Sequence, residues 1–449
     1  MEKTIITPKG IKIHEYRNEH LHSFCICMYV KAGVLYENED NNGISHFWEH
    51  MIFKNINAHM KGEMSQKLDK LGAYFNGCTY KELVEFKITG ATKNFKRCGD
   101  IIAKVFLPMI FEDKDMETER KRIKSEIRED DDESTIDYAA GKTVWKGTSL
   151  RLPVAGKVKD VNAITREMIE EFHKESLVAD NVFFYVTGSY TAKDMEYFID
   201  VIDKAYEIGS VEKDNKKTRG DLASIKEDGI EETANKMSKI RENVAAVPKN
   251  FMNRKCNVKL IKSDKNEIRF SFDFDTTQYK MAQIDLLYDI LFDGECCKVF
   301  KKLSDESGIV YSYSSSIEQY NNIGNIYFSY EVGKKNIIRS IKEIVSILGK
   351  LKESIDDELV LAKPVYADNA SMMLDLPERL NWVMAYEGHV LNAGYKDVKQ
   401  RKKEHLDVTK EEIISIARDI FIKENLCVTI KTTDKKLEKS DVKKVLEKL

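Results

Sequence analysis

The sequence predicts an α+β fold made of two duplicated domains, each a mostly antiparallel sheet packed with helices. Three observations support this prediction. Segments with two-residue apolar alternation, typical of strands, are interleaved with segments of helical periodicity. The order of these segments in the first half recurs in the second, and 449 residues suffice for two cores. We expect an N-terminal domain over 1–211, a charged connection over 212–253, and a homologous C-terminal domain over 254–449.

The first half shows clear apolar patterns in almost every segment. In chain order we predict strands over 11–16 and 22–33, helices from about Gly43 and from near Gly62, a loop over 74–79, a strand over 84–89, helices over 89–106 and 113–128, and a buried strand over 181–188.

The second half repeats this order after a stretch that is rich in charge and poor in apolar residues. We predict a strand over 267–275, a long apolar helix over 281–303, paired strands over 311–316 and 325–332, and a last strand over 426–432 that corresponds to 181–188. Residue identity between the halves is faint, so the duplication rests on the order of elements.

Composition narrows the class of protein. The 72 Lys and Arg against 75 Asp and Glu give a net charge of −3, which argues against a general nucleic-acid binder. No run of 18 apolar residues indicates a membrane span, and the opening residues lack the apolar core of a signal peptide. The eight Cys include no Cys-x-x-Cys pair, so we expect free thiols and a cytoplasmic protein.

One short motif carries chemistry. His46, Glu49 and His50 form His-x-x-Glu-His within a predicted helix, where the two imidazoles lie one turn apart on one face. Only nine His occur in the chain, so this arrangement by chance is rare. Large apolar residues fill the other faces, and a buried helix cannot hold two His and a carboxylate without partners. We therefore predict a metal site, with zinc as the metal that fits best.

Spacing alone leaves the remaining ligand open. Glu119 and Glu126 lie seven residues apart on one face of the helix predicted over 113–128. Either could be a ligand, and either could be a solvated surface charge.

The surrounding sequence resembles the pitrilysin/insulinase family of inverted zincin metallopeptidases, especially the two-domain subunits related to mitochondrial processing peptidase. The segments that carry the resemblance are 31–37, 43–54, 71–82, 119–127, 152–156 and 181–188. The resemblance implies that each chain forms half of a clamshell.

The resemblance also implies a role for individual residues. It implies that His46, His50 and Glu126 bind one zinc ion per chain and that Glu49 is the general base. Glu119 would then orient a ligand from the second shell. The same resemblance implies substrate contacts for Asn76, Thr79 and Glu82.

The second half departs from the family at one position. The segment 300–312 is similar to the family segment in which an Arg and a Tyr, seven apart, contact the substrate and the oxyanion. Tyr311 is present, but Ser304 stands at the Arg position. In the family's dimers the partner supplies this pair, so the resemblance implies the catalytic subunit of a heterodimer. Tyr311 could also be a plain strand aromatic, and Lys301 or Lys302 could supply the positive charge.

The expected function is zinc-dependent hydrolysis of short or extended peptides inside a closed chamber. The peptide would add as a strand to a sheet edge, for which the strand over 84–89 is a candidate. A homodimeric peptidase and a non-catalytic structural homologue remain as alternatives. The sequence leaves the substrate open between precursor-peptide maturation and general peptide degradation.

Overall fold

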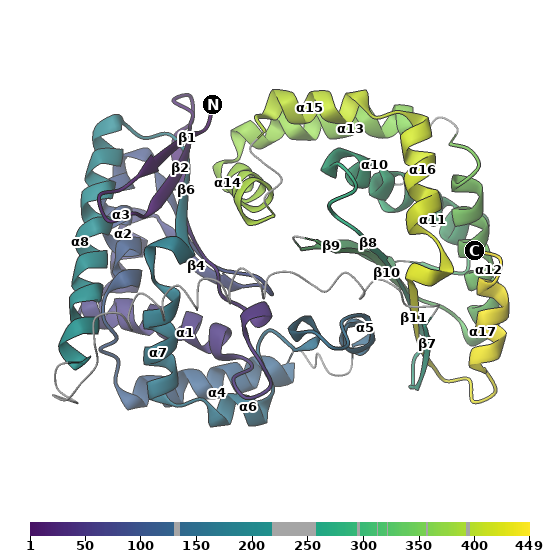
Figure 1. Ribbon diagram of the computed structural model, residues 1–449, viewed down its shortest axis with the longest axis horizontal. Coiled ribbons are helices and arrows are strands. Elements are labelled where there is room, and N and C mark those ends of the chain that lie inside the picture. The colour runs from purple at the N-terminus through teal and green to yellow at the C-terminus, as the bar shows by residue number, and fades with distance from the viewer. Residues whose placement is uncertain are drawn as a thin grey trace, which may run out of the picture. The chain divides into compact units, whose positions relative to one another are not determined.

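The computed structural model describes residues 1–129, 135–217, 257–293, 297–311, 313–320, 322–355, 358–391 and 396–449 (Figure 1). Packing divides the chain into two compact units. The first unit comprises Met1–Asp131, Leu152–Ala245 and Met373–Tyr395, and the second comprises Asp132–Arg151, Ala246–Met372 and Lys396–Leu449. Compared with the contiguous domains expected from the sequence, each unit therefore takes one short segment from the other half. The expected connection over 212–253 begins inside a helix and, from residue 218, lies outside the described residues.

The first unit contains a six-stranded sheet of order β1-β2-β6-β3-β5-β4. Only β2 and β6 pair in parallel; the other neighbours are antiparallel. The strands are β1 (Lys3–Ile6), β2 (Lys12–Arg17), β3 (Ser23–Val30), β4 (Tyr74–Thr79), β5 (Val84–Ala91) and β6 (Val182–Gly188).

The second unit contains a five-stranded sheet of order β7-β11-β8-β10-β9, in which only β7 and β11 are parallel. Its strands are β7 (Asn257–Lys262), β8 (Glu267–Phe274), β9 (Tyr313–Gln319), β10 (Gly324–Glu331) and β11 (Leu426–Thr432). Without β1, the first sheet has the same order and the same single parallel pair. The α+β prediction of two repeated, mostly antiparallel sheets is therefore confirmed.

Helices pack against both sheets. In the first unit they are η1 (Val34–Tyr36), α1 (Ile44–His59), α2 (Met64–Leu71), η2 (Thr92–Asn94), α3 (Phe95–Ile102), η3 (Ala103–Phe106), α4 (Asp113–Glu129), α6 (Val158–Ala163), α7 (Arg166–Ser176), η6 (Ala179–Asn181), α8 (Ala192–Lys217), η10 (Met373–Asp375), α14 (Pro377–Ala385) and η11 (Tyr386–Val390). In the second they are α5 (Ile136–Val144), η5 (Ser149–Arg151), α10 (Met281–Phe292), α11 (Lys298–Phe300), η8 (Lys301–Glu306), η9 (Lys334–Asn336), α12 (Ile337–Leu351), α13 (Glu358–Met372), α15 (Val398–Asp407), α16 (Lys410–Ile420), η12 (Lys423–Asn425) and α17 (Lys439–Leu446). None of these described helices combines the length and apolar character of a membrane span.

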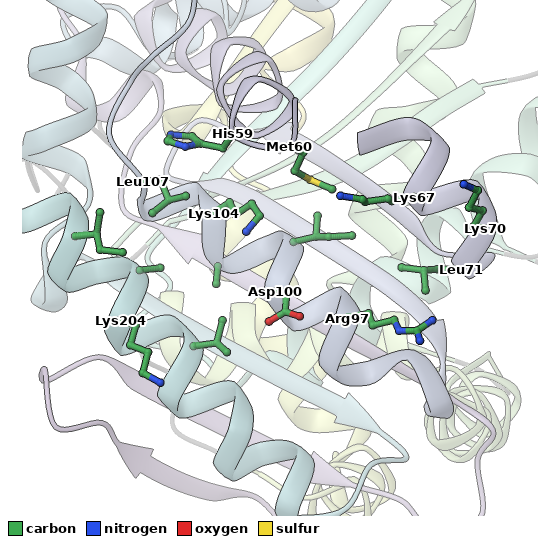
Figure 2. Close-up of a pocket in the computed structure, with 15 residues that line it drawn as sticks. His59, Met60, Lys67, Lys70, Leu71, Arg97, Asp100, Lys104, Leu107 and Lys204 are labelled. Carbon is green, nitrogen blue, oxygen red and sulfur yellow. The ribbon is translucent and has the colours of Figure 1, made fainter. Parts of the chain in front are cut away.

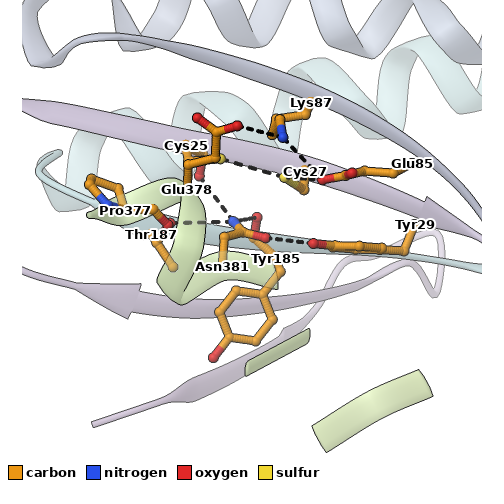
Figure 3. A network of polar contacts seen from close by, with 10 residues as sticks. All are labelled: Cys25, Cys27, Tyr29, Glu85, Lys87, Tyr185, Thr187, Pro377, Glu378 and Asn381. Atoms are coloured by element: carbon orange, nitrogen blue, oxygen red, sulfur yellow. Dashed lines mark hydrogen bonds and ion pairs between the residues drawn. The ribbon is translucent and has the colours of Figure 1, made fainter. Parts of the chain in front are cut away.

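The two faces of the first sheet bury different kinds of side chain. Alternate residues of β3, such as Ile26 and Met28, join the main apolar core. The opposite face carries Cys25, Cys27 and Tyr29, and helix α14 packs onto it (Figure 3).

Asn381 is the centre of this contact. Its amide donates to the carbonyl oxygen of Tyr185 at 2.7 Å, and its side-chain oxygen accepts from the Tyr29 hydroxyl at 2.9 Å. The Thr187 hydroxyl donates to the carbonyl of Pro377 at 2.6 Å. The polar face of the sheet is thus satisfied by a segment that lies almost two hundred residues after its last strand.

Three predicted elements differ in the structure. Residues 74–79 form strand β4, not a loop, and β4 is the edge of the sheet while β5 is internal, so the edge expected over 84–89 was wrong. The helix expected from 89 begins at Phe95, because β5 stays paired with β3 as far as Ala91. The helix expected over 281–303 stops at Phe292, because Asp293 adopts an extended conformation.

Candidate metal centre

Helix α1 carries His46, Glu49 and His50, and its N-terminus is held by a buried carboxylate. Glu37, which is 4% exposed, accepts backbone N–H bonds from Gly43 at 2.8 Å and Ser45 at 3.0 Å. It satisfies N–H groups that the first turn of a helix leaves without partners. Gly43 has a positive φ of 90°, and a Cβ there would lie 2.8 Å from the Ala155 carbonyl oxygen. Segments 31–37 and 152–156 therefore fix where α1 begins.

The body of α1 is fixed by packing on two sides. Phe47, Trp48 and Met51 are fully buried in the core, and the Trp48 indole donates to Nδ1 of His173 at 3.2 Å. Asn55 accepts from the backbone N–H of Ile110 at 2.8 Å, which ties the end of α1 to the segment before α4. The motif is therefore presented by a rigid helix.

Helix α4 supplies the acidic residues and is anchored by Arg120. This guanidinium donates to the carbonyl oxygens of Val161 and Ile164 and stacks 5.0 Å from the ring centroid of Phe47 on α1. Because Arg120 is buried beside Glu119, the anchor sets the face that α4 presents to α1.

Three of the predicted ligands converge. Nε2 of His46 lies 4.0 Å from Oε2 of Glu126, and Nε2 of His50 lies 3.5 Å from the same oxygen. One donor atom from each residue lies within 4.8 Å of the others. A tetrahedral zinc site places ligand atoms about 3.4 Å apart, so small side-chain rotations would close this set around an ion. Two imidazoles and one carboxylate are also the donor set of catalytic zinc, so the residues fit the metal.

Glu119 contacts the far side of the His50 ring and is not one of the three converging ligands. Its Oε2 lies 2.9 Å from Nδ1 of His50, and its Oε1 lies 3.1 Å from Nζ of Lys54. The bond to Nδ1 turns Nε2 of His50 toward Glu126. Although burial raises its pKa, the bonds from His50 and Lys54 bring the pKa of Glu119 down to about 2. The carboxylate therefore stays charged and orients the imidazole.

The two histidines differ electrostatically. Burial and the nearby His50 lower the pKa of His46 to about 3, which keeps its imidazole neutral. Burial also lowers the pKa of His50, but the Glu119 bond and the charges of Glu49 and Glu126 outweigh it and raise that pKa overall. Nδ1 of His46 is buried without a hydrogen-bond partner among the described residues.

Glu49 lies beside the ligands in a space made for its carboxylate. It is 8% exposed, and its Oε2 accepts from the Thr79 hydroxyl at 3.0 Å. Burial raises its pKa, against the lowering effects of His50 and Thr79. A Cβ at Gly77 would lie 2.6 Å from Oε1 of Glu49, so an alanine there would displace the carboxylate. A carboxylate with a raised pKa is suited to accept and return a proton.

The site lies in a cavity of about 680 Å³ within the first unit. Asn76 and Thr79, two of the residues for which the resemblance implies substrate contacts, line it together with the motif residues. Glu82 does not line it; it lies in the turn after β4 and accepts from the Tyr386 hydroxyl. Tyr311 belongs to the second unit and is 95% exposed.

Of the two lysines considered as substitutes for the missing Arg, Lys302 forms an ion pair within the second unit. Ser304 lies in the π-helical segment η8, and Lys302 beside it pairs with Glu306 at 2.9 Å. Lys301 is exposed.

Some residues of the site were not predicted. Glu37 is part of a segment quoted for the resemblance, but a buried carboxylate six residues before a helix has no distinctive pattern. Arg120 looks like any charged residue of a surface helix until its two carbonyl partners are known.

A second cavity of about 730 Å³ lies elsewhere in the first unit, among α2, α3 and α8 and the end of α1 (Figure 2). None of the residues predicted for function lines it. Its lining combines apolar side chains with five cations, which no sequence pattern connects because they come from four separate helices, α2, α3, η3 and α8. The cations are Lys67, Lys70, Arg97, Lys104 and Lys204.

Comparisons with known proteins identify the family. The family model "Insulinase (Peptidase family M16)" matches residues 15–157, and "Peptidase M16 inactive domain" matches residues 163–362. The chain is 21% identical over 428 residues to an uncharacterized zinc protease, YmxG, of Bacillus subtilis, covering 94% of this chain and 96% of that one. It is 24% identical over 185 residues to a probable mitochondrial-processing peptidase subunit beta of Arabidopsis thaliana, covering 40% of this chain and 35% of that one.

The fold has close counterparts among solved structures. A protease from Helicobacter pylori superposes with a TM-score of 0.78 at 16% identity, covering 96% of this chain and 99% of that one. The two family models together span both halves, and full-length relatives are zinc proteases by name. The chain therefore belongs to the insulinase family of peptidases, family M16.

Proposed function

We propose that this chain is a zinc-dependent endopeptidase and the catalytic subunit of a heterodimer. One observation carries the proposal: His46, His50 and Glu126 converge in a cavity beside a buried carboxylate, Glu49, that is not needed as a ligand. A buried acid whose pKa is raised, lying in a cavity beside charged partners, marks a candidate functional site.

Each residue has a distinct part in the proposed reaction. Zinc, when bound by His46, His50 and Glu126, supplies a Lewis acid that polarises the scissile carbonyl and acidifies water. Glu49 accepts the proton of the attacking water and donates it to the leaving amine. Thr79 holds the Glu49 carboxylate by donating to its Oε2, which leaves Oε1 to take the proton.

The peptide binds in the proposal as an added strand along β4. This strand is the edge of the first sheet, it pairs only with β5 among the described strands, and its residues 75–79 line the cavity. Backbone bonds to an edge strand accept many sequences, which suits extended peptides. Asn76 would contact the peptide backbone, as the sequence predicted. Glu82, which does not line the cavity, is proposed to contact the substrate at the edge of the cavity, where its carboxylate accepts from the Tyr386 hydroxyl.

The direct test is Glu49→Gln. This variant keeps the shape of the side chain and all three ligands, so we expect the zinc content of the wild type with activity reduced about 10²–10⁴-fold. Glu129→Gln, on the exposed end of α4, is the matched control and should keep full activity. Undiminished peptide cleavage by Glu49→Gln would refute the proposal.

The heterodimer rests on Ser304 and on relatives that are processing-peptidase beta subunits. We expect this chain alone to be weakly active and to be activated by a homologous subunit that carries an Arg seven residues before its Tyr. Ser304→Arg, made in the isolated chain, should raise its activity if the chain can pair with itself. Equal activity of the chain alone and of the mixture would instead favour the homodimer.

Two further points complete the proposal. A chain that purifies with no zinc and cleaves nothing with any partner would be the non-catalytic structural homologue.

We propose the cytoplasm as the compartment, supported by the described cysteines, which are all free thiols.

A further inference from the structure

A second cluster of two histidines and one glutamate lies in the first unit, and no part of the proposed peptidase site uses it. Glu2, His14 and His389 offer one donor atom each, all within 4.8 Å of one another. These are the residue types and the distance limit that His46, His50 and Glu126 meet. We propose that this cluster is a second, structural metal site for zinc or a similar divalent transition metal.

The three residues come from different segments that the fold brings together. Glu2 precedes β1, His14 lies in β2 opposite Thr4 of β1, and His389 lies in η11, which follows α14. The rings of His14 and His389 stack with centroids 3.6 Å apart and planes at 18°. Nε2 of His389 lies 3.2 Å from Oε2 of Glu2.

Neighbouring hydroxyl groups are placed as supports for metal ligands. Nδ1 of His14 lies 2.9 Å from the Thr4 hydroxyl oxygen, so with its proton on Nδ1 the ring donates there and presents the lone pair of Nε2. The Tyr185 hydroxyl donates to Oε2 of Glu2 at 2.6 Å, which orients the carboxylate. Each of these two ligands thus has an oriented outer partner, as ligands of protein metal sites usually have.

The donor set and its burial suit a metal ion. His14 is 6% exposed, so an ion held there would be largely shielded from bulk water. Two neutral imidazoles and one carboxylate would leave a bound divalent ion with a net charge of +1. Nitrogen and oxygen donors of this kind suit Zn²⁺, Co²⁺ and Ni²⁺ better than Mg²⁺ or Ca²⁺.

The role follows from the positions in the chain. A bound ion would cross-link the first two strands to the segment that carries α14. That segment already packs on the same face of the sheet through Asn381 (Figure 3). The site would thus lock the late segment onto the early sheet, whether or not a substrate is present.

The test separates this site from the peptidase centre. In the chain of residues 1–449, made without an affinity tag, His46→Ala with His50→Ala silences the first site. After chelation and dialysis against micromolar Zn²⁺, we expect one zinc per chain in this background by elemental analysis. Adding His14→Gln or His389→Gln should abolish it, whereas His20→Gln, an exposed histidine of the same unit, should not.

A second variant and a second readout guard against misfolding. Glu2→Gln keeps the side-chain shape and should weaken zinc binding roughly 10- to 100-fold, because one charged ligand becomes a neutral one. Zn²⁺ should raise the melting temperature of the silenced background and leave that of its His14→Gln derivative unchanged. A background that binds no zinc, or a His14→Gln derivative that binds as much as its parent, would overturn the second site without touching the peptidase proposal.

Discussion

The sheets of the two units have the same strand order apart from β1, but the helix that follows the central strand differs between them. In the first unit β3 leads to α1, which carries His46, Glu49 and His50 into a cavity. In the second unit β8 leads to α10, whose polar residues include Asp285 and Asp289, four apart. Asp285 lies 3.1 Å from His405 of α15, so this carboxylate is used inside the unit.

The difference shows what the fold supplies and what it does not. The strand order brings a helix to the same place in both units, with an apolar face toward the sheet. Among the residues that the structure describes, only the first unit adds a second helix whose acidic face meets that helix, and a buried carboxylate that caps its N-terminus. The architecture therefore provides a position, and a few polar residues turn it into a candidate metal site.

The largest effect should come from replacing His50 of α1, with the replacement of Asp289 of α10 as the matched control. His50→Ala removes a ligand, so we expect the loss of one equivalent of zinc and an activity loss of at least about 10³-fold. Asp289→Ala, in the second unit, should keep the zinc of the wild type. Elemental analysis and peptide cleavage measure both, and a His50→Ala chain with full zinc would contradict the ligand assignment.

The next effect concerns the residue that orients a ligand. Glu119→Gln keeps the hydrogen-bonding shape but loses the charge next to His50, so we expect zinc affinity to fall about 10- to 100-fold. Competition with a chromophoric chelator measures the affinity. Glu129→Gln on the same helix is the control, and an equal affinity in both variants would reduce Glu119 to a packing residue.

Helix caps provide a comparison of stability between the units. Glu37→Ala leaves buried N–H groups at the start of α1 without partners and should cost about 2–3 kcal/mol. Thr409→Ala removes an exposed cap of α16, whose hydroxyl accepts from Glu412 at 3.2 Å, and should cost about 1 kcal/mol. Hydrogen exchange of the two helices reports each effect separately. Equal costs would mean that Glu37 is not the main support of α1.

The smallest expected effect is a pH dependence confined to the second unit. Burial and the charges of Asp285 and Asp293 raise the pKa of Asp289 to about 7. Since the folded pKa exceeds the ordinary value, the carboxyl stabilises the fold at low pH, and this stability is lost as pH rises from about 4 to about 7. Asp289→Asn should flatten that decline in denaturant titrations between about pH 4 and about pH 7, and an unchanged pH profile would contradict it.

The parts of the fold that followed from the sequence are those with strong local patterns. Helix α1 begins within one residue of the expected start, and β6 and β11 stop where expected, because apolar runs and glycines mark them. Strand β4 was missed because Gly77 and Asn76 interrupt any alternation, and such residues are tolerated at an edge. The order of strands in space could not be read from local patterns, so the wrong strand was expected at the edge.

The residues of the candidate site also divide into those that local sequence predicts and those that it does not. His46, Glu49 and His50 are close in sequence, and helix geometry alone places them together. Spacing alone left the choice between Glu119 and Glu126 open, and the resemblance assigned Glu126; in the structure the rotation of α4, to which the buried Arg120 contributes, brings Glu126 to both histidines. The cluster of Glu2, His14 and His389 joins residues from opposite ends of the chain, and no spacing rule connects them.

The packing of α14 on the first sheet has a consequence for synthesis on the ribosome. The polar face with Cys25, Tyr29 and Thr187 receives its cover only when Asn381 has left the exit tunnel. Until then a nascent first unit exposes a sheet face whose hydrogen bonds are not yet made, and water must serve instead. A chain truncated before residue 373 should therefore retain β1 to β6 yet bind chaperones longer, as folding units completed late usually do.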